Sequence, residues 1–84
     1  MIFAIDPGNE FSAYVLLDDD LKPIDFDKCT NELLMNKITE LFLVKDIKCD
    51  VAIEMVASYG MSVGKTVFDT CVWIGRFYEA IRRY

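Results

Sequence analysis

The alternation of apolar and polar stretches predicts three strands in the first third of these 84 residues. Residues 2–5, IFAI, form a short apolar run that Pro7-Gly8 ends, which is typical of a buried strand because proline cannot donate to a ladder. Residues 11–17, FSAYVLL, are rich in aromatic and branched side chains and predict a second strand. The acidic triplet 18–20 predicts a hairpin turn, and residues 22–28 a third, more polar strand.

The rest of the chain predicts two helices with one more strand between them. Thr30 or Asn31 can cap a helix that runs to about Val44, residues 51–53 form a buried strand, and residues 64–84 form the last helix. The apolar positions at helical spacing are Leu34, Ile38, Leu41 and Phe42 in the first helix, and Val67, Cys71, Ile74, Tyr78 and Ile81 in the second, widened by Phe68, Val72, Trp73 and Phe77. We expect one face of the last helix to meet the sheet and the other to meet a partner.

The predicted order is therefore β-β-β-α-β-α, which is that of one α/β domain covering residues 1–84. An apolar strand that is reached through a helix is typical of a parallel crossover, so the sheet should be mixed. Hydrophobic residues make up 54% of the chain, more than one small core can hide. The composition therefore favours self-association.

Charge and residue usage narrow the possible chemistry. The net charge of −5 argues mildly against a broad basic surface for phosphates. Without histidine, any metal would be a hard cation held by oxygen ligands. Cys29, Cys49 and Cys71 are expected to be reduced thiols. No secretion signal opens the chain and no long uncharged apolar window interrupts it, so we expect a cytoplasmic protein without a membrane partner.

Two carboxylates occupy equivalent places in this order of elements. Asp6 follows the first apolar strand and Glu54 follows the fourth. If these strands are parallel neighbours, both acids project at one edge of the sheet, where ligands bind in open α/β folds. Like charges so close together favour a bound divalent cation, and Mg²⁺ suits a pair of carboxylates. For either acid alone, a solvated turn residue is the alternative.

The residues around both acids resemble one known family. The stretch FAIDPGNEFSAYVLLD resembles the first strand, Asp-Pro-Gly turn and second strand of the RuvC-like Holliday junction resolvases. The stretch VAIEMVASYGMSVGKTVFDTCVWIGRFYEAI is similar to that family's second segment, an apolar strand ending in Glu, a variable loop and a helix. Gly64 and Gly75 match its glycine turn and its small residue in mid-helix.

The resemblance implies an RNase H-like fold and a metal-dependent endonuclease that cuts branched DNA. Asp6 and Glu54 would be the catalytic metal ligands, with Mg²⁺ or Mn²⁺ as cofactor, and the helix of residues 64–84 would join two copies into a homodimer. Family members carry two further acids on a C-terminal helix that this sequence does not reach. We therefore expect a truncated, N-terminal portion of the fold that is inactive alone.

Three further residues are candidates for contact with nucleic acid. Tyr59 and Met61, in the loop after Glu54, can stack on unpaired bases, and Lys65 can touch a phosphate. Packing and solvated charge are the alternatives for these side chains. Other functions also stay open: a non-catalytic dimerising module of RNase H-like fold, an actin-like ATPase fragment, or a YqgF-like RNase.

Overall fold

Four strands form a mixed sheet in the computed structural model, which describes residues 1–56 and 64–84. The strands are β1 (Ile2–Asp6), β2 (Phe11–Leu17), β3 (Pro23–Thr30) and β4 (Asp50–Ile53). Their order across the sheet is β3-β2-β1-β4, and only the pair of β1 with β4 is parallel. The predicted order of elements, the α/β class and the parallel crossover are confirmed.

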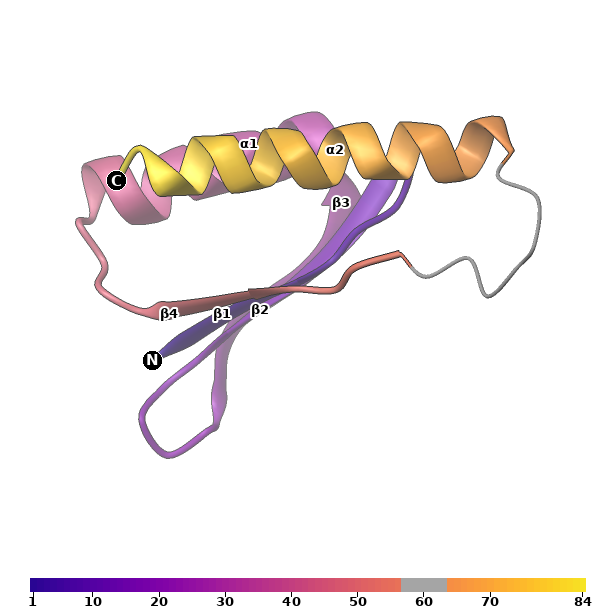
Figure 1. Cartoon of the computed structure of the whole chain (residues 1–84). Coiled ribbons are helices and arrows are strands. Elements are labelled where there is room, and N and C mark those ends of the chain that lie inside the picture. The colour runs from indigo at the N-terminus through magenta and orange to yellow at the C-terminus, as the bar shows by residue number, and fades with distance from the viewer. Residues whose placement is uncertain (57–63) are drawn as a thin grey trace.

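Two helices cover one face of the sheet (Figure 1). Helix α1 (Asn31–Thr39) begins where the hydroxyl of Thr30 accepts a hydrogen bond from the amide of Leu33, and it continues as a π-helical segment, η1 (Glu40–Val44). Helix α2 (Lys65–Arg82) lies beside it. In the two described ranges, no helix is long and apolar enough to cross a bilayer.

The core lies between the helices and the covered face of the sheet. Its fully buried centre is Phe3 of β1, packed against the rings of Tyr14 and Phe42 at 5.7 and 5.8 Å between centroids. The other buried apolar side chains of this cluster are Ile5, Leu16, Leu34, Ile38, Leu41 and Phe77. The apolar stripe that the sequence predicts for the first helix is thus confirmed.

The predicted stripe of the last helix is wrong in part. Helix α2 buries Thr70, Ile74 and Phe77, whereas Cys71 and Tyr78 are exposed. Because this helix is apolar around most of its circumference, spacing alone does not select the buried side. The contact with α1 selects it.

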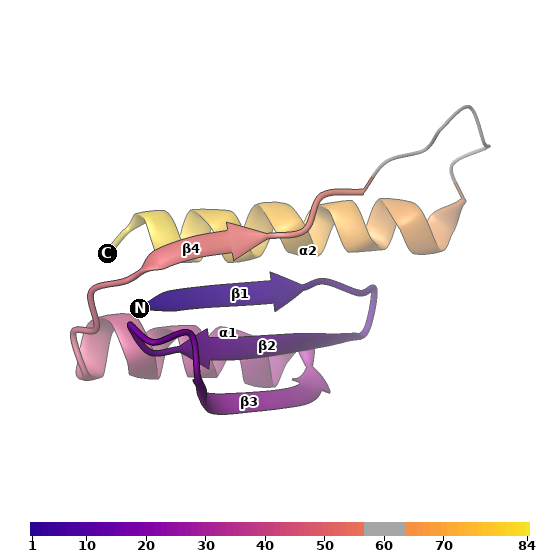
Figure 2. The same ribbon diagram turned by 90° about the horizontal axis from the view of Figure 1, so that it is seen from below.

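The second face of the sheet carries no helix among the described residues (Figure 2). Side chains alternate between the two faces of a strand, so Phe3 and Ile5 point to the helices while Ala4 and Asp6 lie on the opposite face. Figure 2 views the sheet from this open face, with α1 and α2 behind it. The open face is the surface to which the C-terminal end of β1 delivers Asp6.

Replacing two of the glycines by alanine should change the stability of the protein in opposite directions. A Cβ on Gly8 would lie 2.1 Å from the carbonyl oxygen of Phe11, whereas one on Gly75, inside α2, would meet nothing within 4 Å. We expect Gly8→Ala to lower the free energy of unfolding by about 1–3 kcal/mol. Gly75→Ala should raise it by about 0.5–1 kcal/mol because alanine costs less backbone entropy in a helix. Urea unfolding measures both, and equal stability of the two variants would contradict the close approach at Gly8.

Candidate metal centre

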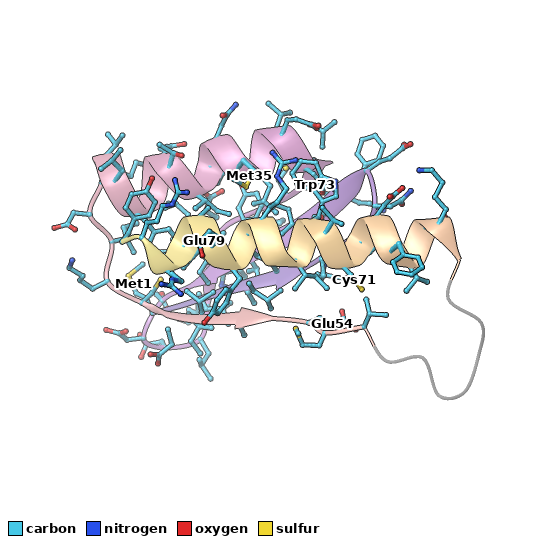
Figure 3. The ribbon with its side chains drawn as sticks, turned by 45° about the horizontal axis from the view of Figure 1, so that its top comes forward. Met1, Met35, Glu54, Cys71, Trp73 and Glu79 are labelled. Atoms are coloured by element: carbon cyan, nitrogen blue, oxygen red, sulfur yellow. The ribbon has the colours of Figure 1, made fainter. Side chains whose placement is uncertain are left out.

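Parallel pairing of β1 with β4 brings Asp6 and Glu54 together. The register pairs Ile5 with Ile53, and the amide of Glu54 donates to the carbonyl of Ile5 at 3.1 Å. Asp6 and Glu54 are therefore the next residues along two adjacent parallel strands, at the same end of the sheet. Figure 3 shows Glu54 directly beyond the end of β4.

The neighbouring position of Asp6 changes the electrostatics of Glu54. The pKa of Glu54 is raised above its ordinary value of 4.5, first by a side-chain hydrogen bond with Asp6 and then by the negative charge of Asp6. Both side chains are exposed. Two like charges held this close favour either a shared proton or a bound cation.

A closed ring of hydrogen bonds holds the turn that follows Asp6. The amide of Gly8 donates to the hydroxyl of Ser12 at 3.0 Å, that hydroxyl donates to Oδ1 of Asn31 at 2.5 Å, and Nδ2 of Asn31 donates to the carbonyl of Gly8 at 3.0 Å. Sequence reasoning missed Ser12 and treated Asn31 only as a possible helix cap. The signal was available, because Ser12 falls on the inward side of β2, where a polar residue needs a buried partner.

Of the three residues predicted to contact nucleic acid, Lys65 lies among the described residues. Lys65 is the first residue of α2, and its exposed ammonium donates to the carboxylate of Asp69 at 2.7 Å. This hydrogen bond is the main reason that the pKa of Lys65 is raised, and the charge of Glu10, in the turn after β1, adds to it. Tyr59 and Met61 lie outside the described residues.

The donor set fits one hard cation. Carboxylate oxygens suit Mg²⁺ and Mn²⁺, and Mg²⁺ is commonly held by one or two carboxylates with water at its other positions. In residues 1–56 and 64–84 no group of three or more acidic or cysteine side chains is arranged to hold a metal. Among the described residues, the candidate ligand set is therefore limited to the pair Asp6 and Glu54.

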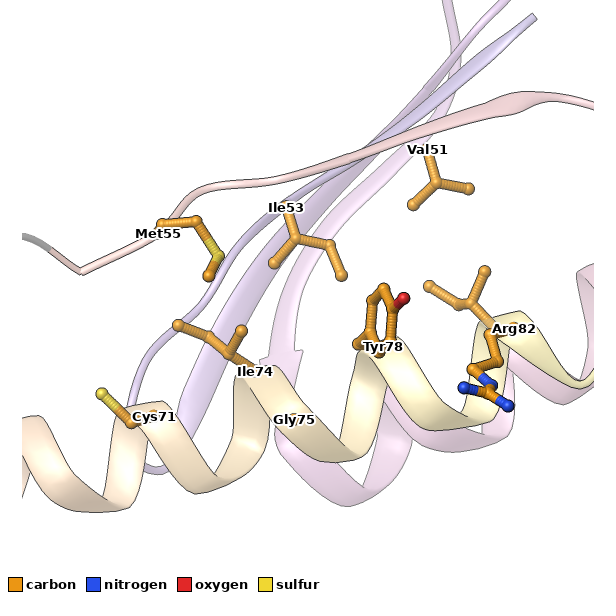
Figure 4. Close-up of a pocket in the computed structure, with 9 residues that line it drawn as sticks. Val51, Ile53, Met55, Cys71, Ile74, Gly75, Tyr78 and Arg82 are labelled. Carbon is orange, nitrogen blue, oxygen red and sulfur yellow. The ribbon is translucent and has the colours of Figure 1, made fainter.

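Two hollows flank this site. One, of about 280 Å³, lies beside Asp6 and is lined by residues of β1 and β2, including Ala4, Ala13 and Val15. The other is an apolar groove of about 660 Å³ between β4 and α2, into which Ile53 and Tyr78 point from opposite sides (Figure 4). Only the first hollow adjoins a carboxylate of the pair.

Comparisons with known protein families, with characterised proteins and with solved structures found no match to this chain. The chemistry of the site is therefore inferred from the chain's own residues. The predicted pair Asp6 and Glu54 lies together, and Ser12 and Asn31 join the site through the turn.

The raised pKa of Glu54 predicts how stability responds to pH. Folded protein binds more protons than unfolded protein between the ordinary and the raised pKa, so the free energy of unfolding rises as pH falls through that interval. In metal-free buffer at pH 7, Glu54→Gln should raise the melting temperature because it removes the repulsion from Asp6. This advantage should shrink as the pH is lowered towards 4.5.

Thermal melts from pH 4 to pH 8 with a chelator test this behaviour. Asp20→Asn, which changes an exposed acid of the hairpin turn, serves as the control and should show no such trend. If Glu54→Gln melts like wild type at pH 7, the two carboxylates do not repel each other in solution.

Proposed function

We propose that these residues form part of the active site of a metal-dependent endonuclease of RNase H-like fold that cuts branched DNA. The single observation that carries the proposal is the placement of Asp6 and Glu54 side by side at the carboxyl ends of adjacent parallel strands. This is the position at which open α/β sheets bind ligands. The resemblance to RuvC-like resolvases at IDPG and VAIE assigns both acids to metal binding.

Both acids would act as carboxylate ligands of Mg²⁺ or Mn²⁺. Asp6, on the central strand β1, is the better fixed of the two because its strand pairs on both sides. Glu54 follows the edge strand β4 and would bind the ion from the side opposite to β2. The ion supplies Lewis-acid stabilisation of the phosphate and activation of a water nucleophile.

The surroundings of the pair suit a phosphodiester backbone. Ala4 and Ala13, two of the residues that line the hollow beside Asp6, are small and leave room next to the carboxylate. Both acids are exposed, as a site for a macromolecular substrate requires. With the carboxylates unneutralised, the local charge would repel DNA, so we propose that the ion must bind before the substrate does.

A second candidate function is a non-catalytic dimerising module of the same fold. It is favoured by the outward side of α2, where two large apolar side chains, one helical turn apart, are at least 60% exposed: Phe68 and Val72. Two copies of the chain that pair through this side would bury these side chains. The homodimer is compatible with both functions, whereas metal binding and DNA cleavage belong to the first.

Metal titration and junction cleavage test the endonuclease. Wild type should bind Mn²⁺ by calorimetry, and Asp6→Asn should weaken binding by at least about ten-fold, since losing a ligand's supporting contacts already costs that much. The matched control is Asp50→Asn, which removes an exposed acid at the opposite end of β4. Its affinity should equal that of wild type.

Cleavage is measured on synthetic four-way junctions with Mg²⁺ or Mn²⁺, using the longest product of the reading frame. Nicking that Asp6→Asn abolishes and Asp50→Asn retains would support the proposal. Metal binding without cleavage of junctions, duplex or single strands would contradict the endonuclease while leaving the metal site intact. Equal Mn²⁺ binding by wild type and Asp6→Asn would contradict the metal site itself.

The outward side of α2 predicts the oligomeric state. Val72→Glu should raise the dimer dissociation constant by at least about ten-fold, because it places a charge at the centre of a desolvated contact. Leu43→Glu alters another exposed apolar residue, on η1, and should leave association unchanged. Sedimentation velocity from micromolar concentrations upwards measures both. A wild type that is monomeric throughout this range would contradict dimerisation through α2.

A further inference from the structure

We propose that Ser12 and Asn31 are positioning residues that fix the direction of the Asp6 carboxylate towards Glu54. This inference deepens the proposed function and rests on it. The hydrogen bonds of both side chains go to each other and to the backbone of Gly8, two residues after Asp6, so they act on Asp6 through the backbone. They are polar side chains that form the inner support of the metal site.

The ring is buried and complete, which gives it rigidity. Asn31 is 0% exposed and Ser12 is 1% exposed. Both polar backbone atoms of Gly8 are used by the ring, and no buried side-chain nitrogen or oxygen in the described part of the chain lacks a partner. Breaking one hydrogen bond of such a ring leaves a buried polar group without a partner. The free-energy cost of that unpaired group keeps the ring closed.

The ring restrains the backbone of Asp6 because only one residue, a proline, lies between Asp6 and Gly8. Asp6 is held on one side by its pairing with Ala13 of β2, and Pro7 has a restricted backbone angle φ. Gly8, the next residue, is clamped by Ser12 and Asn31. The backbone on both sides of Asp6 is therefore restrained, which fixes the direction in which its side chain leaves the backbone.

A fourth hydrogen bond extends this support to the end of the turn. The amide of Asn31 donates to the carbonyl of Glu10 at 2.9 Å, so Asn31 binds the turn at two points. Asn31 is also the first residue of α1, directly after β3. The start of the helix, the third strand and the metal-bearing turn are thus held together by one side chain and its own amide.

Removal of one hydroxyl from β2 gives the sharpest test. Ser12→Ala takes away the acceptor for Gly8, and Tyr14→Phe removes a hydroxyl two residues away on the same covered face, where it bonds Asp25 at 3.2 Å. Ser12→Ala should weaken Mn²⁺ binding by about ten-fold, as the loss of a supporting hydrogen bond behind a ligand does. Tyr14→Phe should bind as wild type does, and Ser12→Thr, which keeps the hydroxyl, should restore affinity.

Hydrogen exchange of the Gly8 amide and the ¹³C shift of the Asp6 carboxyl are the second readouts, measured without metal. Both should change in Ser12→Ala and stay constant in Tyr14→Phe. If Ser12→Ala does not fold, Asn31→Ser serves instead, because its shorter side chain cannot reach the carbonyl of Gly8.

The outcomes separate this inference from the proposed function. A wild type that binds no Mn²⁺ overturns the metal site, and the metal-free shifts then decide whether the ring positions Asp6. A wild type that binds Mn²⁺, with Ser12→Ala or Asn31→Ser binding equally well, overturns the positioning role alone. Equal loss of affinity in Tyr14→Phe also overturns it, since the effect would then follow from general destabilisation.

Discussion

The parallel pairing of β1 with β4 is the contact on which the candidate site depends. It joins segments from opposite halves of the chain, and the helix between them returns the chain to the same end of the sheet. Because both strands run in the same direction, the residues that follow Ile5 and Ile53 meet at one edge. An antiparallel pairing in their place would have put Asp6 and Glu54 at opposite ends.

The candidate metal centre combines repulsion between two exposed acids with hydrogen-bonded polar groups beneath them. The carboxylates of Asp6 and Glu54 disfavour each other in the absence of a cation, as the raised pKa of Glu54 records. The ring of Gly8, Ser12 and Asn31 holds the turn while that repulsion acts. The two neighbouring acids therefore lower the stability of the metal-free protein at this site, whereas the ring of hydrogen bonds raises it.

The apolar surface that α2 leaves uncovered follows from its composition. Thr70, Ile74 and Phe77 face the rest of the protein, while Phe68 and Val72 face outwards on a helix with apolar side chains on more than one side. A helix of this kind is normally covered on both sides. Its outward side thus explains why the high hydrophobic fraction of the chain goes together with a small core.

The sequence by itself determined the order of elements, the stripe of α1 and the two strand-ending acids, because apolar runs, breakers and helical spacing are local signals. It did not determine which side of α2 is buried, since Cys71 and Phe77 are equally apolar choices. Nor did it reveal the ring of Ser12 and Asn31, whose members come from separate elements. Tertiary packing decided both, because burial and the pairing of buried polar groups depend on neighbours that are distant in the sequence.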